Sequence, residues 1–242
     1  ITGIKGKALK EIRKKIQIIF QDPYSSLDPR KNISTLISEP MVIQQVPKSL
    51  FKDKMTRAME FVNLPLSDSF QNKYPDELSG GQRQRVGIAR ALIIDPEFII
   101  ADESVSMLDA SIKAGIINLL LELKERKNLT YLFITHELAL AYHICDRISV
   151  MHRGRIVESG SCSDVIKSPI HPYTRELILS NPPLFPDSGW IKRPQSNTAF
   201  TPDSEVGCGF LMRCPKRKKI CGEQLSELQD FGGGHLSTCN ID

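Results

Sequence analysis

The residues Ser79, Gly80, Gly81 and Gln82 form a short glycine-rich segment at the start of a predicted helix. The unpaired backbone N–H groups and the dipole of a helix start attract an anion, and glycine lets a phosphate approach the backbone without meeting a Cβ atom. By itself such a segment is equally typical of an ordinary turn in which Ser79 caps the helix. The run that continues to Val86 makes the pattern specific and favours a phosphate-binding role.

An acidic pair, Asp102 and Glu103, ends a short apolar strand expected at residues 97–101. There one carboxylate can reach a Mg²⁺ ion held by nucleotide phosphates, and its neighbour can orient or polarise the attacking water. Taken alone, the pair also fits a strand end that faces solvent. His136 follows a second apolar strand at 130–135, where its ring can donate a hydrogen bond to a γ-phosphate; alone, it equally fits a histidine with a structural role.

Short apolar strands alternate with helices along the chain. The expected strands lie at 15–20, 97–101 and 130–135, and the expected helices at 7–15, after Ser79, after Asp109 (a candidate cap) and at 136–145. Such alternation predicts an α/β fold with a mostly parallel sheet covered by helices on both faces. The second and third strands are expected to be buried and to carry the acidic pair and the histidine at their ends.

Two regions depart from this alternation. A helical insert is expected at about 22–95, with its helical spacing over 33–64 broken by Pro40 and Pro47 and with loops at 22–30 and 71–77. Residues 147–152 and 155–158 are expected to form a hairpin around Gly154. After Ser168 prolines crowd a short span, which predicts a linker followed by a small irregular tail that contains cysteines.

The composition is that of an ordinary globular protein, with 40% hydrophobic and 25% charged residues among 242. A formal net charge of +4, with Lys and Arg spread along the chain, gives no sign of nucleic-acid binding. No apolar stretch reaches the roughly 18 residues that span a membrane, and the first residues lack the apolar segment of a signal peptide. Six Cys, most of them in the tail, are too few and too local for a disulfide scaffold, which favours a reducing compartment and a metal site.

The order of these motifs resembles the ATP-binding-cassette (ABC) ATPases. Ser79–Gln82 is similar to the signature motif, Asp102 and Glu103 to the Walker B strand with its catalytic glutamate, and His136 to the switch histidine. Gln21, otherwise a surface glutamine, resembles the Q-loop residue that touches Mg²⁺ or the attacking water. The resemblance implies an α/β, P-loop NTPase-like fold and ATP and Mg²⁺ as cofactors. It also implies that Glu103, His136 and Gln21 take part in catalysis. Asp102 and Gln21 are implied to bind the Mg²⁺ ion.

In this family the signature motif closes on ATP bound to the opposite subunit. The resemblance therefore implies a head-to-tail dimer, homo- or heteromeric, in which Ser79, Gly80, Gly81 and Gln82 meet the partner's ATP. The segment 106–109 resembles the D-loop at that interface, which adds Asp109 to the implied ATP site. The partial cassette is expected at 1–165, with its helical subdomain at about 22–95, and a C-terminal extension at 166–242.

Three separate segments are similar to the oligopeptide and dipeptide importers, a subfamily that includes some nickel importers: Phe20–Arg30, His171–Thr174 and the cysteine pattern from Gly207. This implies a peripheral subunit on the cytoplasmic face of the cell membrane that hydrolyses ATP and energises peptide import. Its implied partners are two integral-membrane permease subunits and, indirectly, an extracellular solute-binding protein, without nucleic acid. Taken singly, the histidines His143, His152, His171 and His235 match no family motif and are interpreted as structural.

The family's phosphate-cradling loop, with its Lys and Ser/Thr, is not found in these residues. The segment Gly3–Lys7 has the wrong spacing, and no Ser/Thr follows Lys7. From the usual order of the motifs, roughly 70–80 residues are expected to precede the printed sequence. The sequence is thus expected to be an N-terminally truncated form that hydrolyses ATP poorly on its own.

The tail has the spacing Cys208-x5-Cys214-x6-Cys221-x17-Cys239 and lacks the CxxC pairs typical of zinc ribbons. Four thiolates can bind one [4Fe–4S] cluster or one Zn²⁺ ion. The resembling subfamily has an iron–sulfur cluster in some members, which favours the cluster. Zinc and a metal-free tail are the alternatives.

Two other functions fit part of the pattern. A soluble ABC ATPase of DNA repair or translation would use the tail on nucleic acid, but the sequence shows no long coiled coil, no second cassette and no aromatic residues interleaved with the basic ones. A catalytically dead remnant that acts as an interaction module would have no chemical need for Asp102, Glu103 and His136.

Overall fold

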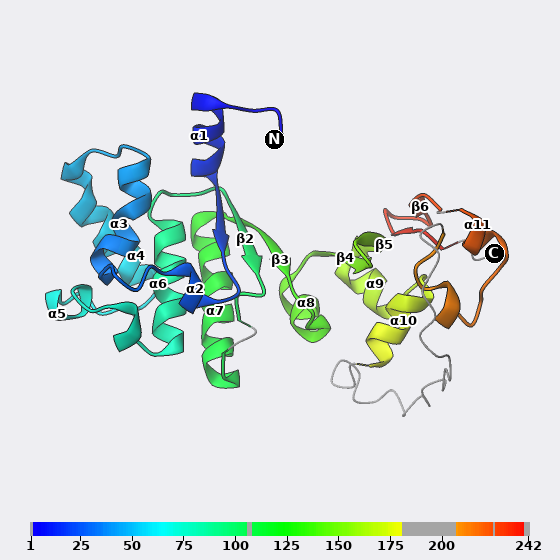
Figure 1. The fold of residues 1–242 in the computed structure, drawn as a ribbon. Helices are drawn as coiled ribbons and strands as arrows, with labels where there is room; N and C mark the ends of the chain where they lie inside the picture. Colours follow the sequence, from blue (N-terminus) through cyan, green and yellow to red (C-terminus); the bar gives the residue numbers. More distant parts are fainter. Residues whose placement is uncertain (1, 106–107, 181–206, 225, 240–242) are drawn as a thin grey trace. The chain divides into compact units, whose positions relative to one another are not determined.

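The structure, a computed structural model, describes all residues except 1, 106–107, 181–206, 225 and 240–242. The chain divides into two compact units, Ile1–His136 and Glu137–Asp242. Figure 1 shows the elements of both units. Among the described residues, no helix has the length and apolar character needed to cross a membrane.

The first unit contains a parallel three-stranded sheet in the order β1-β2-β3. Its strands are β1 (Ile16–Ile19), β2 (Phe98–Asp102) and β3 (Thr130–Ile134), as the apolar runs predict. The register pairs Ile19 with Ala101, and Asp102 with Ile134, so the carboxyl ends of the strands meet at one edge. The residues that follow each strand are therefore neighbours in space.

The two faces of this sheet differ in burial. Ile19, Ile99 and Ala101 are buried on one face, and α6 (Gly80–Leu92) packs against β1. On β3, however, Leu132 is 48% exposed and Ile134 is 47% exposed. The expectation of a buried strand at 130–135 is thus wrong, because β3 is an edge strand of this sheet and its alternate residues lie on an open face.

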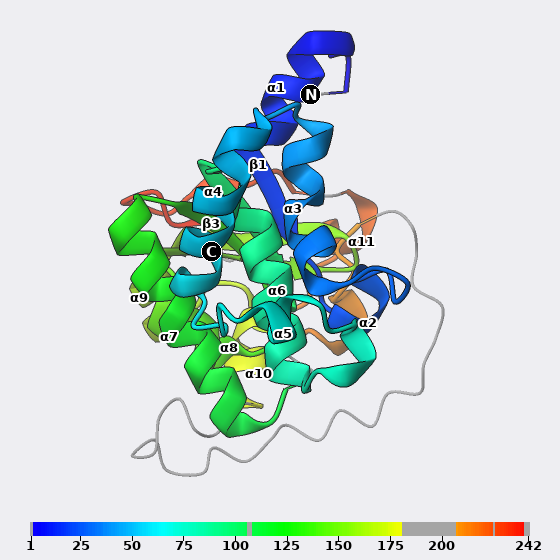
Figure 2. The same ribbon diagram turned by 90° about the vertical axis from the view of Figure 1, so that its left-hand side faces the viewer.

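The helical insert contains more helix than the sequence predicts (Figure 2). The segment expected as a loop at 22–30 contains α2 (Pro23–Ser26), which forms because the Asp22 side chain accepts hydrogen bonds from two of its N–H groups. Pro40 lies inside α3 (Ile33–Ile43) and does not end it. Burial of apolar residues on both sides of Pro40 outweighs the lost hydrogen bond; these are Ile33, Leu36, Ile37 and Met41.

The rest of the first unit consists of helices that surround α6 or precede the sheet. Helix α1 (Gly6–Lys15) leads directly into β1, as expected. The insert continues through η1 (Lys48–Leu50), α4 (Phe51–Phe61), α5 (Asp68–Gln71) and η2 (Pro75–Glu77), so the loop expected at 71–77 contains a short 3₁₀ turn. Both α3 and α4 pack against α6. Helix α7 (Ala110–Lys127) buries the stripe Ile116, Leu119, Leu120 and Leu123.

The second unit is built on an antiparallel sheet in the order β4-β5-β7-β6. The predicted hairpin is confirmed as β4 (Arg147–His152) and β5 (Arg155–Ser161), joined by a turn in which Arg153 and Gly154 have positive φ. The tail contributes β6 (Gln229–Asp230) and β7 (Leu236–Ser237), and β7 pairs with β5. The cysteine-containing tail is therefore joined to the sheet by backbone pairing.

Short helices complete the second unit. These are α8 (Leu138–Ile144), α9 (Cys162–Lys167), α10 (Pro172–Leu179), η4 (Leu211–Arg213) and α11 (Ile220–Glu223). Leu138, Cys162, Ile166 and Ile178 form one buried cluster. The linker expected after Ser168 begins instead with α10, because Pro172 occupies its first turn, where proline is tolerated. The prolines at 182, 183 and 186 lie outside the described residues.

Candidate functional site

Glu103 lies at the carboxyl edge of the parallel sheet, directly after β2. Its backbone has φ +41°, in the left-handed region that few residues other than glycine adopt. The N–H of Glu103 donates a 2.9 Å hydrogen bond to the carbonyl of Ile134 at the end of β3. This bond fixes the unusual backbone conformation and keeps the side chain out of the core, with 27% of it exposed.

Gln21 and His136 both contact the Glu103 carboxylate, one at each oxygen. Gln21, two residues after β1, donates its amide Nε2–H to Oε2 at 2.7 Å. His136, two residues after β3, brings Nδ1 to within 3.1 Å of Oε1. Asp102, half-buried, is the last residue of β2. The fold therefore brings the predicted residues of three strand ends together around one carboxylate.

The start of α6 has the predicted cap. Ser79 is exposed, its Oγ accepts a hydrogen bond from the N–H of Gln82, and the Gln82 side chain accepts one from the N–H of Ser79. Because each side chain satisfies the other residue's backbone N–H, the helix start is stable without a ligand. The backbone of Gly81 lies against α7, and a Cβ there would be 2.8 Å from Cγ2 of Ile112. Gly81 is therefore required for helix packing, a role that the sequence pattern does not reveal.

Asp109 occupies the position before α7, but its side chain makes no capping hydrogen bond. The prediction that it caps this helix is wrong; only its carbonyl takes part, by accepting a hydrogen bond from the N–H of Lys113 at 2.8 Å. Asp109 is exposed. Residues 106 and 107 of the predicted D-loop lie outside the described residues.

Two family models match the chain: "ABC transporter" over residues 2–106 and "Oligopeptide/dipeptide transporter, C-terminal region" over residues 157–221. The oligopeptide transport ATP-binding protein AppF of Bacillus subtilis is 42% identical, over 97% of this chain and 72% of AppF. The dipeptide transport ATP-binding protein DppF of Haemophilus influenzae is 39% identical, over 96% of this chain and 71% of DppF. The chain belongs to the ABC transporter ATP-binding proteins of the oligopeptide/dipeptide group.

A solved structure agrees with this assignment. The protein cbiO1 of Clostridium perfringens, part of the ABC transporter complex cbiONQ, has a TM-score of 0.60 at 25% identity, covering 74% of this chain and 67% of its own. The predicted α/β cassette and the ATPase class are thus confirmed, and the class implies ATP and Mg²⁺.

Helix α6 of this ABC protein, which carries the predicted signature motif, also contacts the segment that follows Gln21. The guanidinium carbon of Arg83 in α6 lies 3.7 Å from the ring centroid of Tyr24 in α2. The same guanidinium donates hydrogen bonds of 3.0 and 2.7 Å to the carbonyl of Leu78. A cation–π contact to a nearly buried Arg holds the two motif-bearing segments together. The sequence does not reveal this pair, because Arg83 and Tyr24 lie far apart in the chain and meet only in the fold.

The four cysteines of the tail, Cys208, Cys214, Cys221 and Cys239, all line one small cavity in the second unit, together with His171. Burial, with the charges of the other three cysteines, raises the pKa of the Cys239 thiol to about 12. Burial also raises the pKa of Cys208 and of Cys214. In the described part of the chain, no three His, Cys, Asp or Glu side chains are arranged so that they could hold a metal ion. The predicted donors share a cavity without forming a finished ligand set.

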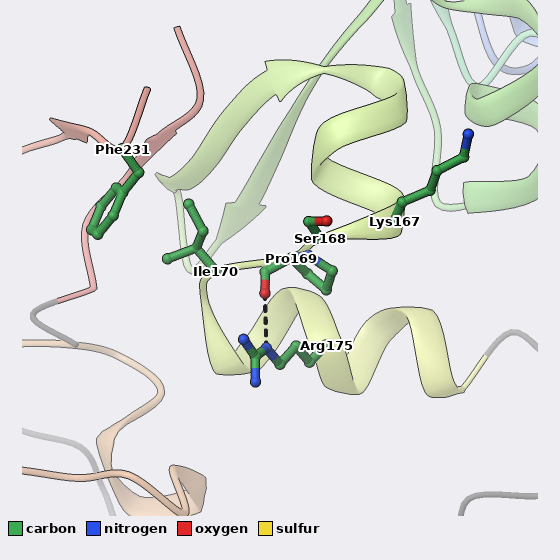
Figure 3. A pocket seen from close by; sticks show the side chains of 6 residues that line it. All are labelled: Lys167, Ser168, Pro169, Ile170, Arg175 and Phe231. Atoms are coloured by element: carbon green, nitrogen blue, oxygen red, sulfur yellow. Dashed lines mark hydrogen bonds between the residues drawn. The ribbon is translucent and has the colours of Figure 1, made fainter. Parts of the chain in front are cut away.

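A wider hollow in the second unit carries none of the predicted site residues (Figure 3). It has a volume of about 420 Å³ and is lined by Lys167, Ser168, Pro169, Ile170, Arg175 and Phe231. The Nε–H of Arg175 donates a 2.8 Å hydrogen bond to the carbonyl of Pro169, which fixes the loop before α10. The hollow is thus shaped by loop packing, and no Asp or Glu is among the residues that line it.

Proposed function

We propose that this chain is the ATP-hydrolysing subunit that energises the import of di- and oligopeptides. The single observation that carries the proposal is the Glu103 carboxylate, held by Gln21 on one oxygen and by His136 on the other. The match to the oligopeptide/dipeptide C-terminal region and the names of the relatives AppF and DppF support peptide as the cargo.

The proposed roles follow from the positions of the side chains. Glu103 is partly exposed and oriented on both oxygens, so it can polarise the water that attacks the γ-phosphate. Asp102 and the amide oxygen of Gln21 offer the oxygen ligands that Mg²⁺ prefers. His136 is 65% exposed beside Glu103, where its ring can donate a hydrogen bond to the γ-phosphate.

The signature segment serves the ATP of a second ATPase subunit, identical or related. Ser79 is exposed, and its side chain and that of Gln82 each accept a hydrogen bond from the other residue's backbone N–H, so the capped helix start lies at the surface where a partner can reach it. Asp109 is also exposed and belongs to the same proposed interface. Two membrane permease subunits, with a solute-binding protein outside the cell, complete the transporter, and this subunit acts peripherally at the cytoplasmic face of the membrane.

We also propose a division of labour within the chain. Residues 1–165 form the nucleotide-binding part, with the helical insert at about 22–95 passing the closing motion to the permeases. Residues 166–242 form the C-terminal extension, which the family match at 157–221 supports.

In the extension, Cys208, Cys214, Cys221 and Cys239 hold a thiolate-bound metal centre, either an iron–sulfur cluster or zinc. The chemistry of the donors fits such a centre, since four sulfurs and a histidine line one cavity. The cavity that these donors line is small, with a volume of about 20 Å³. When bound, the centre would cross-link four separate points of the tail.

Peptide uptake tests the proposed function directly. In cells whose native gene carries Glu103→Gln, uptake of a labelled dipeptide or oligopeptide is expected to stop, because the carboxylate that polarises water is lost. The control is Glu97→Gln at the opposite end of β2, which removes only an exposed ion pair with Lys15 and leaves uptake intact. Normal peptide uptake in the Glu103→Gln cells would show that the proposal is wrong.

A further inference from the structure

Glu158 is a fully buried carboxylate in β5. It accepts hydrogen bonds from the backbone N–H groups of Ile170 and His171, at 2.8 and 2.9 Å. Its Oε1 also lies 2.7 Å from Nε2 of His235, in the hairpin between β6 and β7. A buried charge of this kind is tolerated only when it is well hydrogen-bonded, and here its bonds tie the start of α10 and the tail hairpin to the sheet.

His171, anchored by this carboxylate, has a defined tautomer. The N–H of Tyr173 donates to Nδ1 of His171 at 3.1 Å, so Nδ1 is an acceptor and carries no proton. The ring proton is therefore on Nε2. That nitrogen lies 3.9 Å from Sγ of Cys208, and the residue is 1% exposed. The N–H of a buried, immobilised ring thus faces one of the four sulfurs.

The position of Cys208 is fixed from the other side as well. Its N–H donates to the carbonyl of Cys221 at 2.8 Å, which places two of the four cysteines next to each other. Phe210 packs near the His171 ring, with 6.2 Å between the ring centroids. The ring of His171, at the start of α10, is thus a fixed polar side chain that lines the cysteine cavity.

We propose that His171 is a positioning residue for the metal centre: its Nε2–H donates a hydrogen bond to the Cys208 sulfur and orients it as a ligand, while Glu158 holds His171 in place. This inference rests on the thiolate-bound centre proposed above. A hydrogen bond to a ligating sulfur stabilises the thiolate and raises the reduction potential of an iron–sulfur centre. Partners of this kind typically contribute roughly 10- to 100-fold to metal affinity.

The structure offers a variant that separates this role from helix capping. His171 also caps α10 through Nδ1, and asparagine supplies the same acceptor while lacking the Nε2 donor. His171→Asn should therefore keep the helix and lose the sulfur contact. His171→Gln places an amide N–H near the Nε2 position and should restore the contact. His143→Asn, at an exposed histidine of α8, is the matched control.

The experiment loads the 242-residue chain with iron and sulfide under anaerobic conditions and, in a separate arm, with zinc alone. Metal per chain, the rate of metal loss to a chelator and, for the iron arm, the reduction potential are measured. We expect His171→Asn to lose metal roughly 10- to 100-fold faster than the wild type and to have a lower potential, with His171→Gln near the wild type and His143→Asn unchanged. Circular dichroism checks the fold, and His171→Ser, which also caps a helix, serves if the Asn variant does not fold.

The outcomes separate the two proposals. If the wild type takes up neither iron–sulfide nor zinc, the metal centre is wrong and the role of His171 falls with it. If the wild type loads and Cys208→Ser does not, but His171→Asn matches the wild type in retention and potential, the centre stands and only the role of His171 is overturned.

Discussion

The side-chain amide of Gln21 donates a 2.7 Å hydrogen bond to Glu103, 82 residues away in the sequence. Parallel pairing of β1 with β2 creates this contact, because it places the residues after both strands at one edge of the sheet. Together with His136 on the other oxygen, Gln21 fixes the direction in which the carboxylate points. The catalytic proposal depends on that direction as much as on the presence of the acid.

Glu103→Gln is expected to lower the ATP hydrolysis rate of the encoded protein by roughly 10²- to 10⁴-fold, the range typical of a lost general base. ATP binding should persist, since the amide keeps the size of the side chain and removes only its charge. The measurement is phosphate release at saturating Mg-ATP, beside equilibrium binding of ATP. Glu97→Gln serves as the control. Equal rates of ATP hydrolysis in the two variants would show that Glu103 has no catalytic role.

Gly81→Ala is expected to destabilise the chain by about 1–3 kcal/mol, because the new Cβ would fall 2.8 Å from Cγ2 of Ile112. Gly87, in the same helix, has no atom within 4 Å of a built Cβ, so Gly87→Ala should stabilise by about 0.5–1 kcal/mol through helix propensity. Urea unfolding measures both effects. The double variant Gly81→Ala, Ile112→Ala should lose less unfolding free energy than the two single variants lose together, because the second substitution removes the clash. Strict additivity would show that the two residues do not meet.

The sequence predicts the elements around Glu103 well because their signals are local. The apolar runs before Gln21 and Glu103 predict β1 and β2, and Ser79 forms the N-cap expected at the start of α6. The motif order then predicts which strand ends meet. Other features depend on tertiary packing and cannot be predicted from local signals. Pro40, for example, stays within α3 because the burial of its neighbours outweighs the lost hydrogen bond.

Contacts between distant segments leave no local signal. Nothing in the sequence near His171 indicates that Nε2 faces Cys208, and nothing near Gly81 indicates Ile112 on the next helix. Asp109 shows that a local signal can also mislead: its residue type and its position favour a helix cap, but its side chain makes no capping hydrogen bond. Residue type states what a side chain can do, and the tertiary fold decides whether its partner is within reach.

Asp95 gives a prediction for the dependence of stability on pH. Burial alone would raise the pKa of this carboxyl, but hydrogen bonds from Lys54 and Lys127 lower it below its ordinary value of 3.8. A lowered native pKa means that the pair contributes stability above about pH 4 and loses it as the pH falls through the native pKa. Because the side chain is 60% exposed, solvent screens the pair and its contribution is at most about 1 kcal/mol.

Asp95→Asn is therefore expected to cost up to about 1 kcal/mol at pH 7 and almost nothing at pH 2. Asparagine also tolerates the left-handed φ of +53° at this position, so the substitution isolates the charge. Urea unfolding at several pH values provides the measurement, and 1 M salt should shrink the difference at pH 7. A cost that is the same at both pH values would point to the backbone and not to the ion pairs.

The 242 residues contain no G-x-x-x-x-G-K-[ST] phosphate loop. Charge-assisted hydrogen bonds of the kind that such a loop supplies contribute roughly 1.5–3 kcal/mol each. We therefore expect this chain alone to bind ATP several orders of magnitude more weakly than a fusion with a loop-bearing segment of a relative. Calorimetric titration with Mg-ATP compares the two, and micromolar binding by the chain alone would contradict the expectation.

Gly207→Ala is expected to open the cysteine cavity. Gly207 has φ +107°, and a Cβ there would lie 2.6 Å from the carbonyl oxygen of Cys221. The backbone must shift, which breaks the bond between the Cys208 N–H and the same carbonyl. Gly232→Ala is the matched control, because Gly232 has a similar φ of +113° but no atom within 4 Å of a built Cβ, so it carries the conformational strain without the clash.

The rate at which a thiol reagent reacts with the metal-free chain distinguishes the two substitutions. Gly207→Ala should expose Cys208 and Cys221 and speed the reaction, whereas Gly232→Ala should react like the wild type. Equal acceleration in both variants would mean that backbone strain alone loosens the tail. No acceleration in Gly207→Ala would mean that the close approach of Gly207 to Cys221 does not hold the cavity together.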